Sequence, residues 1–504
     1  MNKTVTFTPL YRQSMTVFKG FKALALGSAL GLMVTLPAAA YARAPEVSTG
    51  GEEQIKAQDE LAKEQWAYSV GIQAYVFGLP LLIFDREQRL RLDATRLERV
   101  KHLCPCAPVN SIGHMSKLAT AHDQLPYTPN NDTVYSGGLL DLEQEPVVLT
   151  LPDITHRYWS LQVANAYLEN VLYLGSRASD GEGGNHVFVG PHWQGELPKD
   201  LIVHRMKSNR AVLALRIGVE QEKPNDLERV TELQHQVFTT SLSNWGKASL
   251  FGKTNAPQKT LKTYGGELAF YERFADLMID NPPEAKHAAA LAPFKHIGII
   301  PGLPFEVDEL DAATRRGMAR ALMDGKNIMR WKVKYRGTPY NNGWNNLHEG
   351  RYGFNYINRA EGALEGLLVH NREEAVYFST YEDSAGKLFD ANHRYVLHFD
   401  KDQIPPVIGN GFWSITMYGP DFQLVKNPIE RYSIGDRTDT LKYNEDGSLD
   451  IYIQNTPPEG REGNWLPSPE VGLFRLNYRI YRPEVEAQTP GTLTQFLPGV
   501  KRLD

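Results

Sequence analysis

The pattern that most constrains the fold is an alternation of apolar and polar residues near the C-terminus. Leu449, Ile451 and Ile453 alternate with polar neighbours, and residues 474–481 repeat the pattern. A period of two predicts a β-strand with one buried face. Similar strand signals occur at residues 147–151 and 158–163. We therefore predict a β-rich region in each half of the chain.

The middle of the chain has the period of a helix instead. Apolar residues recur at three- and four-residue steps in the segments 227–242, 261–278 and 307–335, with Pro and Gly between them. The fold class that fits is α+β, with two β-sandwich or jelly-roll-like regions and a helical insert between them. We place an N-terminal helix and β-rich domain at 52–220, a mostly helical segment at 221–370, and a jelly-roll β-sandwich at 371–504.

The N-terminus has the three parts of a secretory signal peptide. A basic leader without an acid is followed by an uncharged run at 23–36 and by the small-residue pattern at 40–42. A membrane anchor is the alternative, but a spanning helix needs about 20 apolar residues, and Pro37 ends this run early. We predict a signal peptide at residues 1–42, a location in the periplasm or outside the cell, and no transmembrane anchor after cleavage.

The net charge excludes one class of partner. The whole chain has a formal charge of -5, and removal of Lys3, Arg12, Lys19 and Lys22 with the leader takes this to about -9. A nucleic-acid-binding protein needs a basic face to neutralise phosphates. We therefore expect no nucleic-acid partner.

The two cysteines, Cys104 and Cys106, flank a single proline. An oxidising compartment favours a disulfide, although a bridge between residues i and i+2 is strained and easily reduced. A soft-metal site with His102 is the other interpretation. The state of the pair stays open at this point, and we assign no metal ligands and no cofactor.

Two sets of motifs carry a family resemblance. Residues 129–135, which read Pro-Asn-Asn-Asp-Thr-Val-Tyr, together with 140–142 and 146–149, resemble the bacterial domain of unknown function 1254. Residues 394–399, 412–414, 427–437 and 464–467 resemble its usual companion, domain of unknown function 1214. The resemblance implies a jelly roll similar to carbohydrate-active proteins in the second half and an envelope or periplasmic oligomer. It implies no catalytic residues, and the cysteine pair is not part of the pattern.

Candidate ligand-binding residues in the first half lie in the 130–135 motif and beside the following strand. Asn130, Asn131 and Asp132 could orient a polyol while Tyr135 stacks on it, but the same residues are typical of a turn. Arg157 could clamp an anion, or pair internally with Asp132 or Asp153. The neighbouring aromatic candidates are Tyr158 and Tyr167.

The second half offers a denser polar group. Arg431, Tyr432, Asp436 and Arg437 could bind an anionic sugar, or form a buried ion network that joins strands. Asn464 and Trp465 add an indole that could stack on a sugar ring or close one end of the sandwich.

Glycoside hydrolysis needs two carboxyl groups, and Asp132 and Asp436 are the candidates. The leading hypothesis is an exported periplasmic protein that binds, and possibly processes as a glycan-acting hydrolase, a carbohydrate or cell-envelope glycan. A non-catalytic oligomeric envelope protein is one alternative. An enzyme acting on a non-sugar small molecule in the groove between the two β regions is another. A homo-oligomer is expected in each case.

Overall fold

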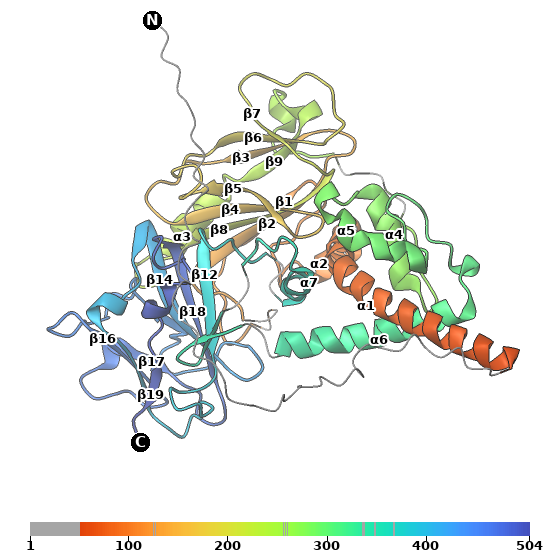
Figure 1. Cartoon of the computed structure of the whole chain (residues 1–504). Helices are drawn as coiled ribbons and strands as arrows, with labels where there is room; N and C mark the ends of the chain where they lie inside the picture. The colour runs from red at the N-terminus through yellow and green to blue at the C-terminus, as the bar shows by residue number, and fades with distance from the viewer. Residues whose placement is uncertain are drawn as a thin grey trace, which may run out of the picture. The chain divides into compact units, whose positions relative to one another are not determined.

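The computed structural model describes residues 51–504 except 124, 126–127, 256, 258, 260, 335–337, 347–348 and 366–367. The predicted signal peptide at 1–42 lies outside the described residues. Helices and four open sheets make a mixed α+β fold, with a helical region between the strand-rich parts (Figure 1). This confirms the predicted fold class.

The first strand-rich part contains two mainly antiparallel sheets. One has the order β1-β2-β8-β4-β5 and the other the order β7-β6-β3-β9. Their facing side chains, among them Val134, Leu149, Leu161 and Phe188, form one buried core. The strands are β1 (Ile112–Met115), β2 (Thr133–Asp141), β3 (Val147–Leu151), β4 (Trp159–Asn165), β5 (Asn170–Gly175), β6 (Gly184–Val189), β7 (Ile202–Arg205), β8 (Arg210–Gly218) and β9 (Phe238–Ser241).

The second strand-rich part also holds two sheets, with the orders β10-β11-β12-β18-β14-β15 and β17-β16-β13-β19. The apolar side chains of the predicted alternating strands, such as Ile451, Leu476 and Tyr478, meet in its core. The strands are β10 (Thr338–Asn341), β11 (Trp344–Asn346), β12 (Ala375–Thr380), β13 (Tyr395–Phe399), β14 (Val407–Tyr418), β15 (Ser433–Gly435), β16 (Leu449–Gln454), β17 (Trp465–Pro467), β18 (Arg475–Pro483) and β19 (Val500–Arg502).

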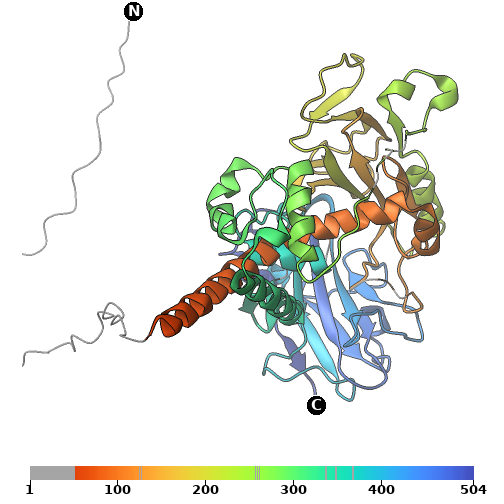
Figure 2. The same ribbon diagram turned by 90° about the vertical axis from the view of Figure 1, so that its right-hand side faces the viewer.

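Helices α1, α4, α5, α6 and α7 pack on the outer face of the first sheet, whereas α3 packs against the core between the two sheets. Leu139 of β2 and Val212 of β8 share a core with apolar residues of α1, α4, α6 and α7, and α1 and α6 lie side by side in both ribbon views (Figure 2). The helices are α1 (Glu52–Leu92), α2 (Ala94–Val100), α3 (Asp226–Gln234), α4 (Ala269–Asp280), α5 (Ala288–Leu291), α6 (Ala312–Lys334) and α7 (Tyr356–Glu365).

Helix α1 is long and apolar enough, by length and composition alone, to cross a membrane. However, 72% of its most apolar stretch is buried inside the protein. Phe77 and Leu81 are almost fully buried. This burial is typical of a core helix of a globular domain.

Candidate functional site

Asp132 joins the two strand-rich parts. Ser414 Oγ of β14 donates to Asp132 Oδ2 at 2.7 Å, and Arg437 Nη2 lies 3.4 Å from Asp132 Oδ1. Asn130 Oδ1 accepts from the Asp132 amide, as expected for an Asx turn, and Asn130 Nδ2 donates to the Tyr481 hydroxyl. Asn131 is also bonded across the junction, because its Oδ1 accepts from Ser433 Oγ. The turn therefore also connects the two domains.

The two predicted acids lie in one neighbourhood. Asp436 Oδ1 accepts from the Trp413 amide, the residue before Ser414. Burial raises the pKa of Asp436 to about 7, and the negative charge of Asp132 contributes to that shift. By its accessible surface Asp436 is nevertheless an exposed residue, so water screens much of this effect.

A recess of about 620 Å³ opens beside Asp132, and we call it the acidic recess. Arg431, Arg437 and Trp465 line it. Arg431 Nη1 donates to the Glu462, Gly463 and Trp465 carbonyl oxygens, and the Arg437 guanidinium stacks on the Phe412 ring. Both arginines are therefore largely occupied by protein contacts.

Several predicted ligand residues make contacts within the protein. Arg157 makes a two-pronged ion pair with Asp226 at 2.8 Å for both bonds, and not with Asp132 or Asp153. The Tyr158 hydroxyl donates to Ser160 and Glu374.

The Tyr167 hydroxyl donates to the Asn281 carbonyl. Tyr432 packs in a small apolar cluster with Tyr418. Asn464 is bonded to the backbone of Lys442 and Asp450. Trp465 is only 4% exposed and its indole donates to the Gln454 carbonyl, so its ring is not free to stack on a sugar.

The larger candidate site is a cavity of about 640 Å³, which we call the inter-sheet cavity. It lies between the sheet that contains β2 and β8 and the sheet that contains β12 and β18. Its floor holds two Tyr–Arg pairs. Tyr135 of β2 lies directly opposite Arg216 of β8, with the guanidinium 5.3 Å from the ring centre. Tyr377 of β12 lies directly opposite Arg479 of β18. Each sheet therefore presents one aromatic ring and one cation to the same cavity.

Small residues leave the space for this cavity. The next opposed pair along β2 and β8 is Gly137 with Ala214, and both line the cavity. One step further, Leu139 and Val212 are opposed, and there the helices cover the sheet. On this face of β2 and β8, the small side chains therefore leave space for the cavity, and the larger side chains of Leu139 and Val212 mark its end.

The charge of the cavity is strongly positive. Six lining residues are basic and Glu87 is the one acid among the described lining residues. The Arg216 guanidinium donates to Gln162 Oε1 at 2.7 Å and to the Leu368 carbonyl. The Arg479 guanidinium donates to Thr416, Tyr418 and the Thr128 carbonyl. Within the described part of the chain, neither arginine has a carboxylate within ion-pair distance, although the Asp132 carboxylate acts on Arg479 from beyond that distance and favours its charged form.

Four buried polar atoms of residues that line the cavity lack partners among the described residues: Arg91 Nε, Thr133 Oγ1, Asn477 Oδ1 and the Tyr478 hydroxyl oxygen. Thr133 and Asn477 share strand faces with Tyr135 and Arg479, respectively. Buried polar groups without partners are uncommon in native proteins, and each needs an explanation such as an ordered water, an ion or a functional role.

The comparisons with known proteins bear on the domains that form this cavity. Residues 109–241 match the family described as a protein of unknown function, DUF1254, and residues 374–485 match the one described as DUF1214. The chain contains a DUF1254 domain followed by a DUF1214 domain. This confirms the predicted resemblance and its order.

Among solved structures, the chain is similar to the VPA0106 protein from Vibrio parahaemolyticus. The identity is 24% and the TM-score 0.64, over 87% of this chain and 100% of that one. An uncharacterized protein from Burkholderia cenocepacia aligns with 12% identity and a TM-score of 0.41, over 89% and 98% of the two chains. The comparison with curated proteins gave no match. The first likeness shows a shared fold.

The DUF1254 domain supplies Tyr135 and Arg216, and the DUF1214 domain supplies Tyr377 and Arg479. Of these four residues, only Tyr135 was predicted from the sequence. The alternation at 474–481 did place Asn477 and Arg479 on the polar face of a strand. Nothing in the sequence showed that this face meets another sheet.

A histidine lies behind the cavity without reaching it. His370 Nε2 is 3.3 Å from Ser160 Oγ, but both residues are fully buried and neither lines the cavity. Burial lowers the pKa of His370 well below its ordinary value. The Ser–His contact is therefore part of the junction between the domains.

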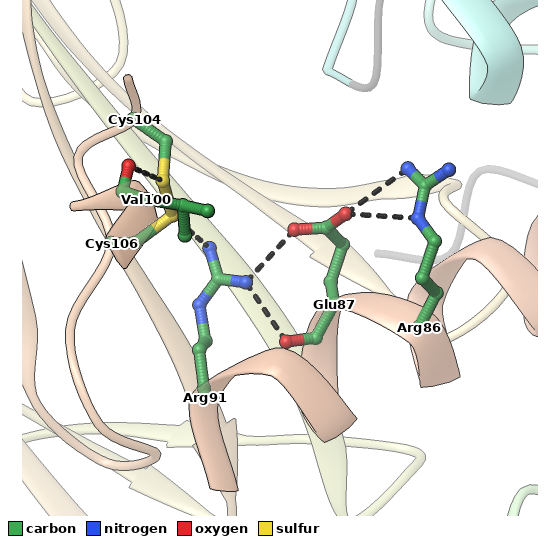
Figure 3. Close-up of a disulfide and its surroundings, with 6 residues drawn as sticks. All are labelled: Arg86, Glu87, Arg91, Val100, Cys104 and Cys106. Carbon is green, nitrogen blue, oxygen red and sulfur yellow. Dashed lines mark hydrogen bonds and ion pairs between the residues drawn. A yellow bond between two sulfur atoms is a disulfide. The ribbon is translucent and has the colours of Figure 1, made fainter. Parts of the chain in front are cut away.

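The cysteines form a disulfide (Figure 3). This settles the state that the sequence left open. The two cysteines line the inter-sheet cavity and are half-buried, and we call this part of the cavity its mouth. Among the described residues, no group of three or more His, Cys, Asp or Glu side chains is placed to hold a metal ion.

Proposed function

We propose that this protein binds a small organic anion with an apolar body in the inter-sheet cavity. The observation that carries the proposal is the pair of buried arginines, Arg216 and Arg479, which have neutral hydrogen-bond partners. They are 7% and 5% exposed. A buried charge is costly without a counter-charge, and a bound carboxylate would supply one.

The apolar walls of the cavity favour a ligand whose body, apart from its anionic group, is apolar. Apolar side chains surround the floor, among them Leu90, Val100, Met115 and Leu364. A volume of about 640 Å³ is within the ordinary range for small-molecule sites. The Tyr377 hydroxyl would serve as a donor to the anion, because burial raises its pKa and keeps it protonated. A medium-chain fatty acid or an aromatic acid has this combination of groups.

The proposal includes a location outside the cytoplasm. It rests on the leader at residues 1–42, whose basic, apolar and small-residue parts follow in the order of a signal peptide. A homo-oligomer remains a prediction, and size-exclusion chromatography with light scattering tests it.

A thermal-shift series tests the binding proposal. Decanoate, decanol and glucuronate are compared on the mature protein, and decanoate alone is expected to raise Tm strongly. A ligand at a hundredfold excess over its Kd stabilises the folded state by about 2.7 kcal/mol. Arg479→Gln should remove the shift, and Arg99→Gln, an exposed arginine outside the cavity lining, should keep it. Equal shifts with decanoate and decanol would exclude an anion site.

A second candidate function is saccharide processing in the acidic recess, as a glycan-acting hydrolase. The observation in its favour is Asp436, whose raised pKa lets it hold a proton near neutral pH in the neighbourhood of Asp132. Against it, Asp436 is not among the residues that line the recess, and its Oδ1 accepts from the Trp413 amide. A Tm rise with glucuronate that is lost in Asp436→Asn would support it. The buried indole of Trp465 makes it the weaker candidate.

A further inference from the structure

The Cys104–Cys106 loop forms part of the wall at the mouth of the inter-sheet cavity. Both cysteines and Pro105 line the mouth. The loop rests directly on β1 and β2, where a side chain at Gly113 would meet the Cys106 carbonyl at 2.6 Å and one at Gly137 the Pro105 carbonyl at 2.7 Å. Glycine at both positions lets the loop lie against the sheet with its disulfide open to the cavity.

The two sulfurs have opposite electrostatic surroundings. Arg91 Nη2 lies 3.5 Å from Cys106 Sγ, while Arg91 Nη1 donates to Glu87 Oε2 at 3.0 Å (Figure 3). Cys104 Sγ lies 3.5 Å from the Val100 carbonyl oxygen instead. A cation stabilises a thiolate and a carbonyl oxygen disfavours one. Negative charge is therefore stabilised better at Cys106 than at Cys104.

We propose that the Cys104–Cys106 disulfide is a thiol–disulfide exchange site for small anionic thiols that enter the cavity mouth. A substrate thiolate attacks Cys104 Sγ, the bond between Cys104 and Cys106 breaks, and its electron pair goes to Cys106, which leaves as a thiolate beside Arg91. A second substrate thiolate then attacks the substrate sulfur of the mixed disulfide. The bond between that sulfur and Cys104 breaks, and Cys104 takes the electron pair and a proton from water to leave as a thiol. The substrate is oxidised to its disulfide, and both cysteines end reduced. This activity does not depend on what the cavity floor binds.

The charge of the mouth sets the substrate class. Arg86, Arg91, Arg96 and Lys117 line the same cavity as the disulfide. Glu87 pairs with Arg86 and Arg91, and Asp123 pairs with Lys117, which leaves a net positive charge. A positive mouth attracts anionic thiols and raises their local concentration. Glutathione should therefore react faster per thiolate than the cationic thiol cysteamine, and added salt should reduce the difference.

Peptide mapping of the wild-type protein tests which sulfur is attacked. The folded protein reacts briefly with limiting reduced glutathione, is quenched with iodoacetamide and is digested for mass spectrometry. The expected product carries glutathione on Cys104 and the alkyl group on Cys106. The reverse labelling would overturn the proposed direction, and reduction seen only in denaturant would overturn the exchange site itself.

Arg91 acts as a positioning residue that stabilises the Cys106 thiolate when it leaves. A series of variants tests this role. Arg91→Gln should slow exchange, because it raises the pKa of the leaving thiol and a thiol of higher pKa leaves more slowly. In Cys104→Ser, thiolate absorbance reports the Cys106 pKa, which Arg91→Gln should raise and Arg91→Lys should restore. Arg99→Gln, which removes an exposed charge from α2, is the matched control. An unchanged Cys106 pKa in Arg91→Gln would contradict the role of Arg91.

Discussion

Single glycines decide how closely the cysteine loop approaches the sheet. In Gly137→Ala the new methyl group would meet the Pro105 carbonyl, so we expect a loss of about 1–3 kcal/mol in the free energy of unfolding. Urea unfolding measures it. The matched control is Gly491→Ala, which has open space around it and an ordinary backbone conformation, and its effect should stay within about 0.5 kcal/mol. Equal effects of the two substitutions would show that the loop does not rest on β2.

The Asp436 carboxyl predicts a pH dependence of stability. Its pKa is raised to about 7 in the folded protein, above the value of about 3.9 for an unfolded chain. The folded state therefore binds this proton more tightly, and the stability it contributes at low pH is lost as the pH rises from about 4 to 7. Asp436→Asn should be more stable than the wild type at pH 8 and similar to it near pH 4. The same difference at both values would contradict the raised pKa.

At the residue scale, the sequence predicted the acidic recess better than the inter-sheet cavity. The motif at 130–132 and the Arg431–Arg437 group stand out because polar residues cluster along the chain, and the structure does bring Asp132, Asp436 and Arg437 together. Arg216 and Tyr377 are single residues in strands. Their partners, Tyr135 and Arg479, lie on a neighbouring strand of the same sheet that is distant in the sequence, so no local pattern points to them.

At the scale of elements, one buried ion pair fixes α3 to the DUF1254 sheet. Arg157 precedes β4 and Asp226 begins α3, and their side chains are 8% and 2% exposed. Arg157→Gln leaves a buried carboxylate without its partner and should cost about 3–5 kcal/mol in the free energy of unfolding. Arg351→Gln breaks the exposed pair with Glu373 and should cost less than about 1 kcal/mol. Urea unfolding of both variants compares them, and similar losses would contradict the structural role of Arg157.

The elements also show where periodicity misleads. The helix predicted at 227–242 is correct for α3 but wrong at its end, where β9 begins at Phe238. The run from 237 to 240 contains three β-branched residues and one Phe, which favour a strand at the edge of a sheet. The β9 strand then pairs with β3. The hydrogen bonds that stabilise this strand come from β3, which is distant in the sequence, so the local periodicity does not reveal them.

At the scale of the whole molecule, the inter-sheet cavity depends on both domains at once. The residues that join them are buried, with the Phe412 and Tyr481 rings stacked at 4.3 Å and Asp132 bonded to Ser414. The sequence predicted two β regions with a helical insert, because strand and helix periods are local. It did not predict which faces meet, since that depends on contacts between residues hundreds of positions apart.

The most direct test of the anion site is a displacement titration with 8-anilinonaphthalene-1-sulfonate, an aromatic anion, on the folded mature protein. We expect the probe to fluoresce when bound, decanoate to displace it, and decanol at the same concentration to leave it bound. Arg216→Gln and Arg479→Gln, checked for an unchanged circular dichroism spectrum, should bind the probe at least tenfold more weakly, which corresponds to about 1.4 kcal/mol. Probe binding that decanol displaces equally, or that both substitutions leave unchanged, would contradict the account.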